Sequence, residues 1–125
     1  LQPAFEAIKY YEELLLRYPK SSHAKDAKKK ISKAEGMIRD KEQYIADFYY
    51  KTEDFEAARW RYLNILDNFK EKDIVKHSME RIILSSYHMK DYEKCDLFAK
   101  KYSPALKEKS SNLKDAINTC TKKTK

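Results

Sequence analysis

Apolar side chains recur along this chain with the period of an α-helix, and this pattern limits the fold more than any other feature. Between Pro3 and Tyr18 they fall three or four residues apart, which places them on one face of a helix. Pro3 suits the first turn, and the Tyr18-Pro19 pair predicts the end, because a residue before proline is driven out of the helical conformation. The apolar positions are Ala4, Ala7, Ile8, Tyr11, Leu14, Leu15 and Tyr18.

A second, much longer helix is predicted from His23 to Tyr50. Its start is marked by Ser21 or Ser22, because serine is a favoured residue at helix N-termini. If continuous, it contains 28 residues and spans roughly 42 Å at 1.5 Å per residue. Its apolar face, interrupted at Lys41, carries Ala24, Ala27, Ile31, Ala34, Ile38, Ile45 and Phe48.

The rest of the chain predicts four shorter helices joined by tight turns. One covers about residues 54–69, and the next two begin at Asp73 and Asp91, whose carboxylates suit helix N-caps. The last follows Ser103-Pro104 and is expected to end near Thr121. The apolar faces carry Phe55, Ala58, Tyr62, Ile65 and Phe69, then Val75, Met79, Ile82, Ile83 and Met89, then Tyr92, Cys95, Phe98, Ala99 and Tyr102, and finally Leu106, Leu113, Ile117 and Cys120.

The composition supports an all-helical chain, since glycine occurs once and proline three times in 125 residues. Glycine poverty also argues against loops that bind phosphate through closely spaced backbone amides. The predicted fold is all-α: a TPR-like (tetratricopeptide) α-solenoid of antiparallel helix pairs with a C-terminal capping helix. The aromatic residues expected in its core are Tyr11, Phe55, Tyr62, Tyr92 and Tyr102.

One stretch meets the first four terms of the tetratricopeptide pattern, with Ala46, Tyr49, Ala58 and Tyr62 at the required spacings, although Lys70 replaces the proline of that pattern. Ala7, Tyr11 and Pro19 match the second helix of a preceding repeat, which would leave its apolar face uncovered without a first helix. We therefore expect the native protein to extend N-terminally. The predicted units are a truncated repeat at 1–20, a repeat with an extended first helix at 21–70, a repeat-like pair at 71–104, and a capping helix with a basic tail at 105–125.

The step from Ala7 to Ala58 is 51 residues instead of the usual 34, so about 17 residues lengthen the helix before the second match. This helix, the segment Glu42-Gln-Tyr-Ile-Ala46, and the helix opened by Phe55 resemble the BamD family, over roughly residues 3–104. Glu53 and Lys90 depart from that family, whose turns between paired helices usually contain glycine.

The resemblance implies a non-enzymatic, lipid-anchored scaffold at the periplasmic face of the outer membrane. Its implied partners are the POTRA domains of the barrel-forming assembly subunit, other assembly lipoproteins, and unfolded outer-membrane protein clients. The anchoring cysteine would precede this chain, which itself predicts no transmembrane helix and no signal peptide. Arg61 matches the family's functional arginine, which contacts a POTRA domain, so we expect it to bind the partner.

Three neighbours of Arg61 complete the predicted partner-binding site: Trp60, Glu42 and Arg59. Trp and Arg are enriched at binding hot spots. Against this, Trp60 is expected to be buried, because the second helix of a repeat also packs on the next repeat. Arg61 could equally pair within the chain, with Glu42, Asp54 or Asp67.

Two other functions remain open. One is a different bacterial TPR adaptor that binds an extended peptide in its concave groove. The other is a nucleic-acid module, because residues 103–125 carry six basic and two acidic groups, and lysines cluster at Lys25, Lys28, Lys29, Lys30 and Lys33. Nucleic-acid binding is not expected, since no aromatic residues are interleaved with these lysines.

No cofactor, metal ion or catalytic activity is predicted. His23, His77 and His88 are scattered, and the four-residue spacing of Asp73 and His77 alone does not make a metal site. Cys95 and Cys120 could form a disulfide only if the last helix folds back to bring their Cα atoms within about 7 Å. We expect instead two unpaired, partly buried thiols.

Overall fold

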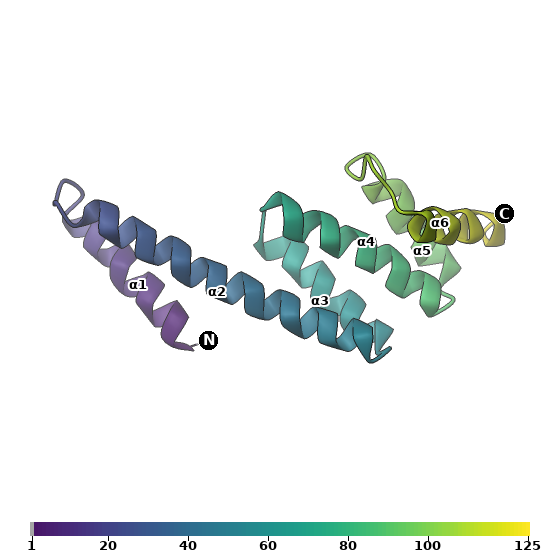
Figure 1. The fold of residues 1–125 in the computed structure, drawn as a ribbon, viewed down its shortest axis with the longest axis horizontal. Coiled ribbons are helices and arrows are strands. Elements are labelled where there is room, and N and C mark those ends of the chain that lie inside the picture. Colours follow the sequence, from purple (N-terminus) through teal and green to yellow (C-terminus); the bar gives the residue numbers. More distant parts are fainter. Residues whose placement is uncertain (1) are drawn as a thin grey trace. The chain divides into compact units, whose positions relative to one another are not determined.

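The computed structural model describes residues 2–125, which form helices connected by short turns (Figure 1). Within this range the fold is all-α, with packed adjacent helix pairs as in a TPR-like solenoid, so the predicted fold class is confirmed. No helix of the described residues is long and apolar enough to cross a membrane. The helices are α1 (Gln2–Arg17), α2 (Ala24–Lys51), α3 (Phe55–Asn68), α4 (Lys72–His88), α5 (Tyr92–Tyr102) and α6 (Ser111–Lys123).

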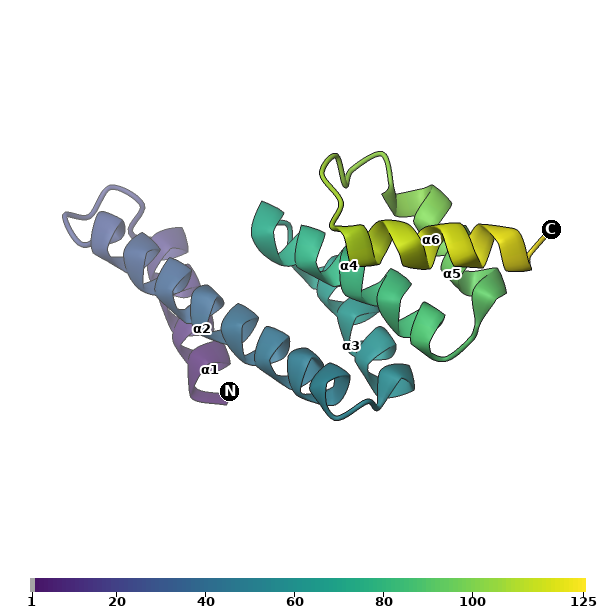
Figure 2. The ribbon, with the colours of Figure 1, turned by 45° about the vertical axis from the view of Figure 1, so that its right-hand side comes forward.

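The chain divides into two compact units, Leu1–Lys41 and Glu42–Lys125, and the division falls inside α2. In the first unit, α1 lies beside the N-terminal part of α2 in both ribbon views (Figures 1 and 2). Its buried side chains are small apart from one isoleucine: Ala4, Ala27, Ala34 and Ile38.

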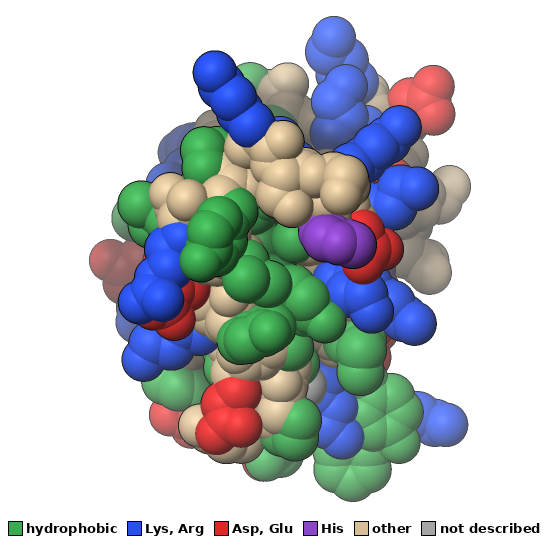
Figure 3. Space-filling view, turned by 90° about the vertical axis from the view of Figure 1, so that its left-hand side faces the viewer, with side chains coloured by type: hydrophobic (Ala, Val, Ile, Leu, Met, Phe, Trp, Pro, Cys, Tyr) green, Lys and Arg blue, Asp and Glu red, His purple; other side chains and the backbone are tan. Residues whose placement is uncertain are grey.

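The end of the first unit at the turn between α1 and α2 carries both apolar and basic side chains, which Figure 3 shows gathered on one face. Leu16 is 83% exposed and Tyr18 is 60% exposed. The five lysines of the predicted cluster in α2 are exposed, as expected for the solvent face of an amphipathic helix.

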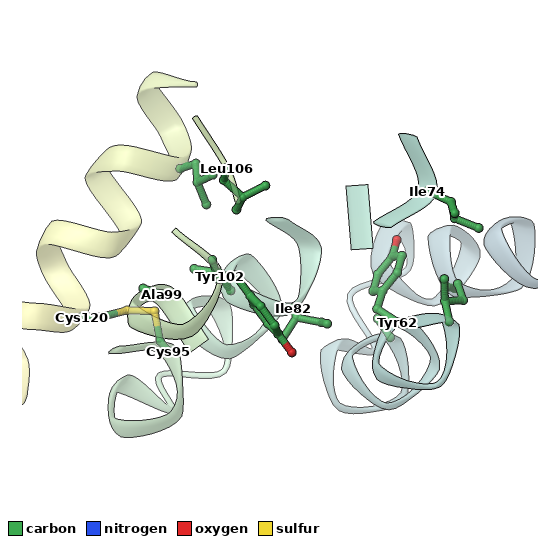
Figure 4. Close-up of a cluster of buried hydrophobic side chains, with 13 residues drawn as sticks. Tyr62, Ile74, Ile82, Cys95, Ala99, Tyr102, Leu106 and Cys120 are labelled. Carbon is green, nitrogen blue, oxygen red and sulfur yellow. A yellow bond between two sulfur atoms is a disulfide. The ribbon is translucent and has the colours of Figure 1, made fainter. Parts of the chain in front are cut away.

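In the second unit, α4 packs against α3, α5 and α6. The core is continuous across these helices and the last turns of α2 (Figure 4). The repeat motif lies within it: Ala46, Ala58 and Tyr62 have no exposed surface, whereas Tyr49 is half-buried. Among the aromatic residues expected in the core, Tyr62 and Tyr102 are buried, while Tyr11, Phe55 and Tyr92 are only half-buried.

Aspartate side chains cap the N-termini of α3 and α5, which begin where the sequence predicts. Asp54 accepts a hydrogen bond from the Ala57 amide and Asp91 from the Lys94 amide, each at 3.4 Å. Directly before these caps, Glu53 and Lys90 adopt left-handed backbone conformations, with φ of 65° and 60°. Two non-glycine residues therefore occupy turn positions that favour glycine.

Two predicted helix boundaries were wrong. Asp73 does not cap α4: the N-cap is Glu71, without a side-chain cap hydrogen bond, and Asp73 lies in the first turn. Leu106 is not helical but is buried in the connection between α5 and α6, where its carbonyl accepts a hydrogen bond from Lys109 Nζ at 2.7 Å. The last helix also continues past Thr121 to Lys123.

The prediction of two unpaired thiols was wrong as well. Cys95 in α5 and Cys120 in α6 form a disulfide, with their Cα atoms 5.9 Å apart (Figure 4). The last helix does fold back, because its apolar residues Leu113 and Ala116 are buried in the second unit beside Cys120.

Candidate partner-binding site

The predicted site residues all lie in the second unit, on the last turns of α2 and the first half of α3. Arg61 stands beside the buried face formed by Ala58 and Tyr62, so the stem of its side chain is partly covered while its guanidinium group reaches the surface. One third of its side-chain surface, 34%, is exposed. The helix pair therefore holds this charge at the rim of the core.

The guanidinium group of Arg61 has an acidic neighbour and two aromatic neighbours. Its Nη1 lies 3.9 Å from Glu42 Oε2, an ion-pair distance too long for a hydrogen bond. Its central carbon lies 5.9 Å from the Tyr49 ring centre and 5.7 Å from the Trp60 ring centre. Glu42, Tyr49 and Trp60 thus surround Arg61, and its contact with Glu42 is one of the pairings within the chain that the sequence left open, so partner binding by these residues stays a prediction.

A surface hollow of about 480 Å³ opens at this cluster and is lined by Tyr49, Asp54, Glu56, Ala57, Trp60 and Arg61. The expectation that Trp60 is buried was wrong, since 61% of its surface is exposed. The reason is that the neighbouring helices cover the side of α3 that carries Ala58, Tyr62 and Ile65. Trp60 therefore presents a large amphipathic ring to solvent beside a cation.

Arg59 does not line this hollow, and its side chain contacts residues of α4 and the start of α5 instead. Its Nη1 donates to Asp91 Oδ2 at 2.9 Å and to Ser86 Oγ at 3.1 Å, and its side chain is only 14% exposed. Burial alone would raise the pKa of Asp91, but the hydrogen bond and charge of Arg59, with the Lys94 amide, outweigh it and lower that pKa. Arg59 joins α3 to the start of α5, and its predicted contact with a partner stays a prediction.

A polar network that the sequence did not reveal joins α2, α3 and α4. The Tyr62 hydroxyl donates to Asp47 Oδ1, and His77 Nε2 lies 2.7 Å from the same oxygen. Burial and the adjacent Asp47 carboxylate raise the pKa of Tyr62. The sequence spacing suggested Asp73 as the neighbour of His77, whereas the observed partner is 30 residues away in the chain.

A second hollow of about 400 Å³ lies where α3 ends, α4 begins and α5 ends. Its lining is mostly apolar, with charged side chains at Asp67, Lys70 and Lys101. The apolar lining residues are Leu63, Leu66, Phe69, Val75, Met79 and Tyr102.

The described part of the chain contains no group of three histidine, cysteine or carboxylate side chains placed to hold a metal ion. The first hollow offers an arginine fork with five donors, an exposed indole ring and nearby carboxylates, which are groups that suit the recognition of another protein.

A comparison with protein-family models matched residues 1–102 to the family YfiO, described as outer membrane lipoprotein. Comparisons with curated proteins and with solved structures gave no match. The matched residues include the whole Arg61 cluster and end at the last residue of α5, whereas α6 lies beyond them.

Proposed function

The chain belongs to the YfiO family of outer membrane lipoproteins, and from this membership we propose that it is a non-enzymatic scaffold resembling BamD. In this role it binds the POTRA region of the barrel-forming subunit and so assists the folding and insertion of outer-membrane β-barrel proteins. Other assembly lipoproteins and unfolded client proteins are further proposed partners. The proposed location is the periplasmic face of the outer membrane, with a lipid anchor preceding this chain.

The observation that carries the proposal is the incomplete pairing of Arg61. Its contact with Glu42 is 3.9 Å long, and the group stands at the rim of an open hollow. A carboxylate on the partner could accept two parallel hydrogen bonds from the guanidinium fork, a geometry that lysine cannot reproduce. Such a bond would be charge-assisted and partly screened from water by the Tyr49 and Trp60 rings.

Trp60 and Glu42 contribute to the same proposal in different ways. Trp60 offers an exposed ring that can be buried against the partner, and large amphipathic rings often anchor interfaces. Glu42 keeps the guanidinium group near the hollow before the partner arrives, because an ion pair of this length restrains the arginine without satisfying its donors.

The test is the affinity of the full chain for purified POTRA domains, measured by calorimetry. Arg61→Ala should weaken binding by about 1–3 kcal/mol, the range for a charged hydrogen-bonding group, and should leave helicity and melting temperature nearly unchanged. Arg61→Lys should recover little of the loss. The matched control is Arg17→Ala, since Arg17 is an exposed arginine paired with Glu13 in α1. Lost stability with intact binding would make Arg61 a structural residue and remove this support.

A second candidate function is an adaptor that binds an extended peptide, and the hollow lined by Leu66, Phe69 and Met79 favours it. Met79 suits such a site because its flexible thioether adapts to different side chains. Met79→Glu and Arg61→Ala separate the two functions. Loss of POTRA binding through Arg61→Ala alone supports the scaffold, whereas loss of binding to an extended peptide through Met79→Glu, by a chain that does not bind POTRA domains, supports the adaptor.

A further inference from the structure

The helix α6 lies outside the residues matched by the family model, yet it is bonded covalently to a helix inside them. Residues 103–125 are thus an addition to the matched region. In the structure α6 covers part of α4 and α5, at the end of the helix array (Figure 2).

Apolar contacts alone give α6 a weak attachment. Its fully buried side chains are Leu113, Ala116 and Cys120, of which only Leu113 is large, and Ile117 is half-buried against the same core. Because hydrophobic stabilisation scales with the apolar area buried, two small side chains add little to one leucine. A helix of 13 residues is also marginal in water by itself, so α6 needs a stabilising contact to stay folded.

The remaining contacts gather at one end of the α5–α6 pair. Beside the Cys95–Cys120 bond, Thr121 Oγ1 donates to Asp96 Oδ1 at 3.0 Å, and Lys123 Nζ lies 5.9 Å from the Tyr92 ring centre. Because these contacts join the first turns of α5 to the last turns of α6, the two helices are antiparallel. A hydrogen bond from Lys100 and a second from Thr121 lower the pKa of Asp96, which keeps this carboxylate charged beside the disulfide.

We propose that the Cys95–Cys120 bond is a redox lock that holds α6 over α4 and α5, so that the array is capped only in an oxidising compartment. In its formation the two thiols lose two protons and two electrons. The electrons pass to the disulfide of a thiol–disulfide exchange catalyst, which leaves as a dithiol. Such bonds persist in the bacterial periplasm and are rare in the reducing cytosol. The chain is therefore uncapped until it reaches the compartment in which an outer membrane lipoprotein resides.

The bond closes a loop of 25 residues, and cross-linking a loop of this size restricts the unfolded segment strongly. Both cysteines are fully buried. A reductant therefore reaches the sulfur atoms only when α6 opens locally, which makes the lock slow to release under native conditions.

The test is hydrogen–deuterium exchange on the full chain, with and without reduction by dithiothreitol. Intact mass confirms the state, because the disulfide form lacks two hydrogens. Reduction should speed exchange in α6 on the order of a hundredfold, while α3 and α4 change little. The double variant Cys95→Ala/Cys120→Ala should exchange rapidly in α6 with or without dithiothreitol, which controls for effects of the reductant itself.

Three outcomes would contradict the proposal that the disulfide holds α6 in place. The first is a mass showing two free thiols in protein purified from an oxidising compartment. The second is unchanged exchange in α6 of the fully reduced chain. The third is an equal rise across α3, α4 and α6, which would make the bond a general stabiliser of the second unit. None of these depends on whether Arg61 binds POTRA domains.

Discussion

The two units of this molecule use the same helical pattern but bury very different side chains. In the first unit the buried residues are three alanines and one isoleucine, and four large apolar side chains of α1 and the following turn are more than half exposed: Phe5, Tyr10, Leu16 and Tyr18. In the second unit a connected core extends over α3, α4, α5 and α6 and includes Tyr62, Ile65, Ile82 and Leu113, none more than 1% exposed.

Helical periodicity and core formation are therefore separate properties of this chain. The apolar face of α1 is as regular as those of the later helices, yet only Ala4 on it is fully buried, and its large side chains, such as Ile8, Tyr11 and Leu14, are half-buried. Because hydrophobic stabilisation follows buried area, the second unit should hold most of the stability of the chain. The polar network of Asp47, Tyr62 and His77 and the disulfide strengthen it further.

The largest expected effect comes from truncating a core isoleucine in each unit. Ile82→Ala should cost about 2–5 kcal/mol, because Ile82 is fully buried in α4 and its neighbours cannot fill the space. Ile38→Ala should cost distinctly less, since Ile38 lies among alanines and retains some exposure. Urea unfolding followed by hydrogen exchange in α1 and α4 measures both. Equal losses would mean that the first unit is as well packed as the second.

Replacing a buried alanine by a larger residue also tests the difference in packing between the two units. Ala58→Leu should overpack the crossing of α2 and α3 and cost about 1–3 kcal/mol, because Ala58 has no exposed surface. The counterpart Ala27→Leu should lower the stability less, since the helices of the first unit bury fewer large side chains. Melting temperatures of both variants provide the comparison, and an unchanged value for Ala58→Leu would show that the repeat alignment is wrong.

Acid should weaken the second unit through Asp91 and Asp96, whose pKa values are lowered in the folded chain. A lowered folded pKa contributes stability that is fully present above the unfolded value of about 3.9 and is lost as the pH falls through the folded pKa. The melting temperature should therefore fall as the pH drops below about 4. The Asp96→Asn variant should have a lower melting temperature than the wild type near neutral pH, and its melting temperature should depend less on pH in this range. A wild-type melting temperature that stays constant there would contradict the assignment.

The smallest effects concern the two left-handed turn residues of the second unit. Glu53→Gly and Lys90→Gly should each stabilise the chain by about 0.5–1 kcal/mol, because glycine removes the steric cost of a positive φ. Glu56→Gly in α3 is the control, and it should destabilise by about 0.5–1 kcal/mol as glycine does within a helix. The midpoints of chemical denaturation measure these changes. A lower stability of Glu53→Gly or Lys90→Gly would argue against the left-handed conformation at that residue.

The helices and most of their ends could be predicted from the amino-acid sequence. Aspartate caps at Asp54 and Asp91, the Tyr18-Pro19 stop and the apolar periodicity are local signals, and local signals suffice to place a helix. The family pattern also indicated that Glu53 and Lys90 stand where glycine is usual, and both have a positive φ. The pairing of Arg61 with Glu42 was one of three alternatives that the sequence left open, and helix packing decided among them.

Which helix covers which face could not be predicted, because it depends on contacts between distant residues. The Cys95–Cys120 disulfide, the Arg59–Asp91 ion pair and the Asp47–His77 contact join residues 25 to 32 positions apart on different helices. Periodicity identifies the apolar side of a helix but carries no information about the helix packed against it. For this reason the exposure of Trp60 and the covalent attachment of α6 could not be deduced from the chain alone, although their residues were all visible in it.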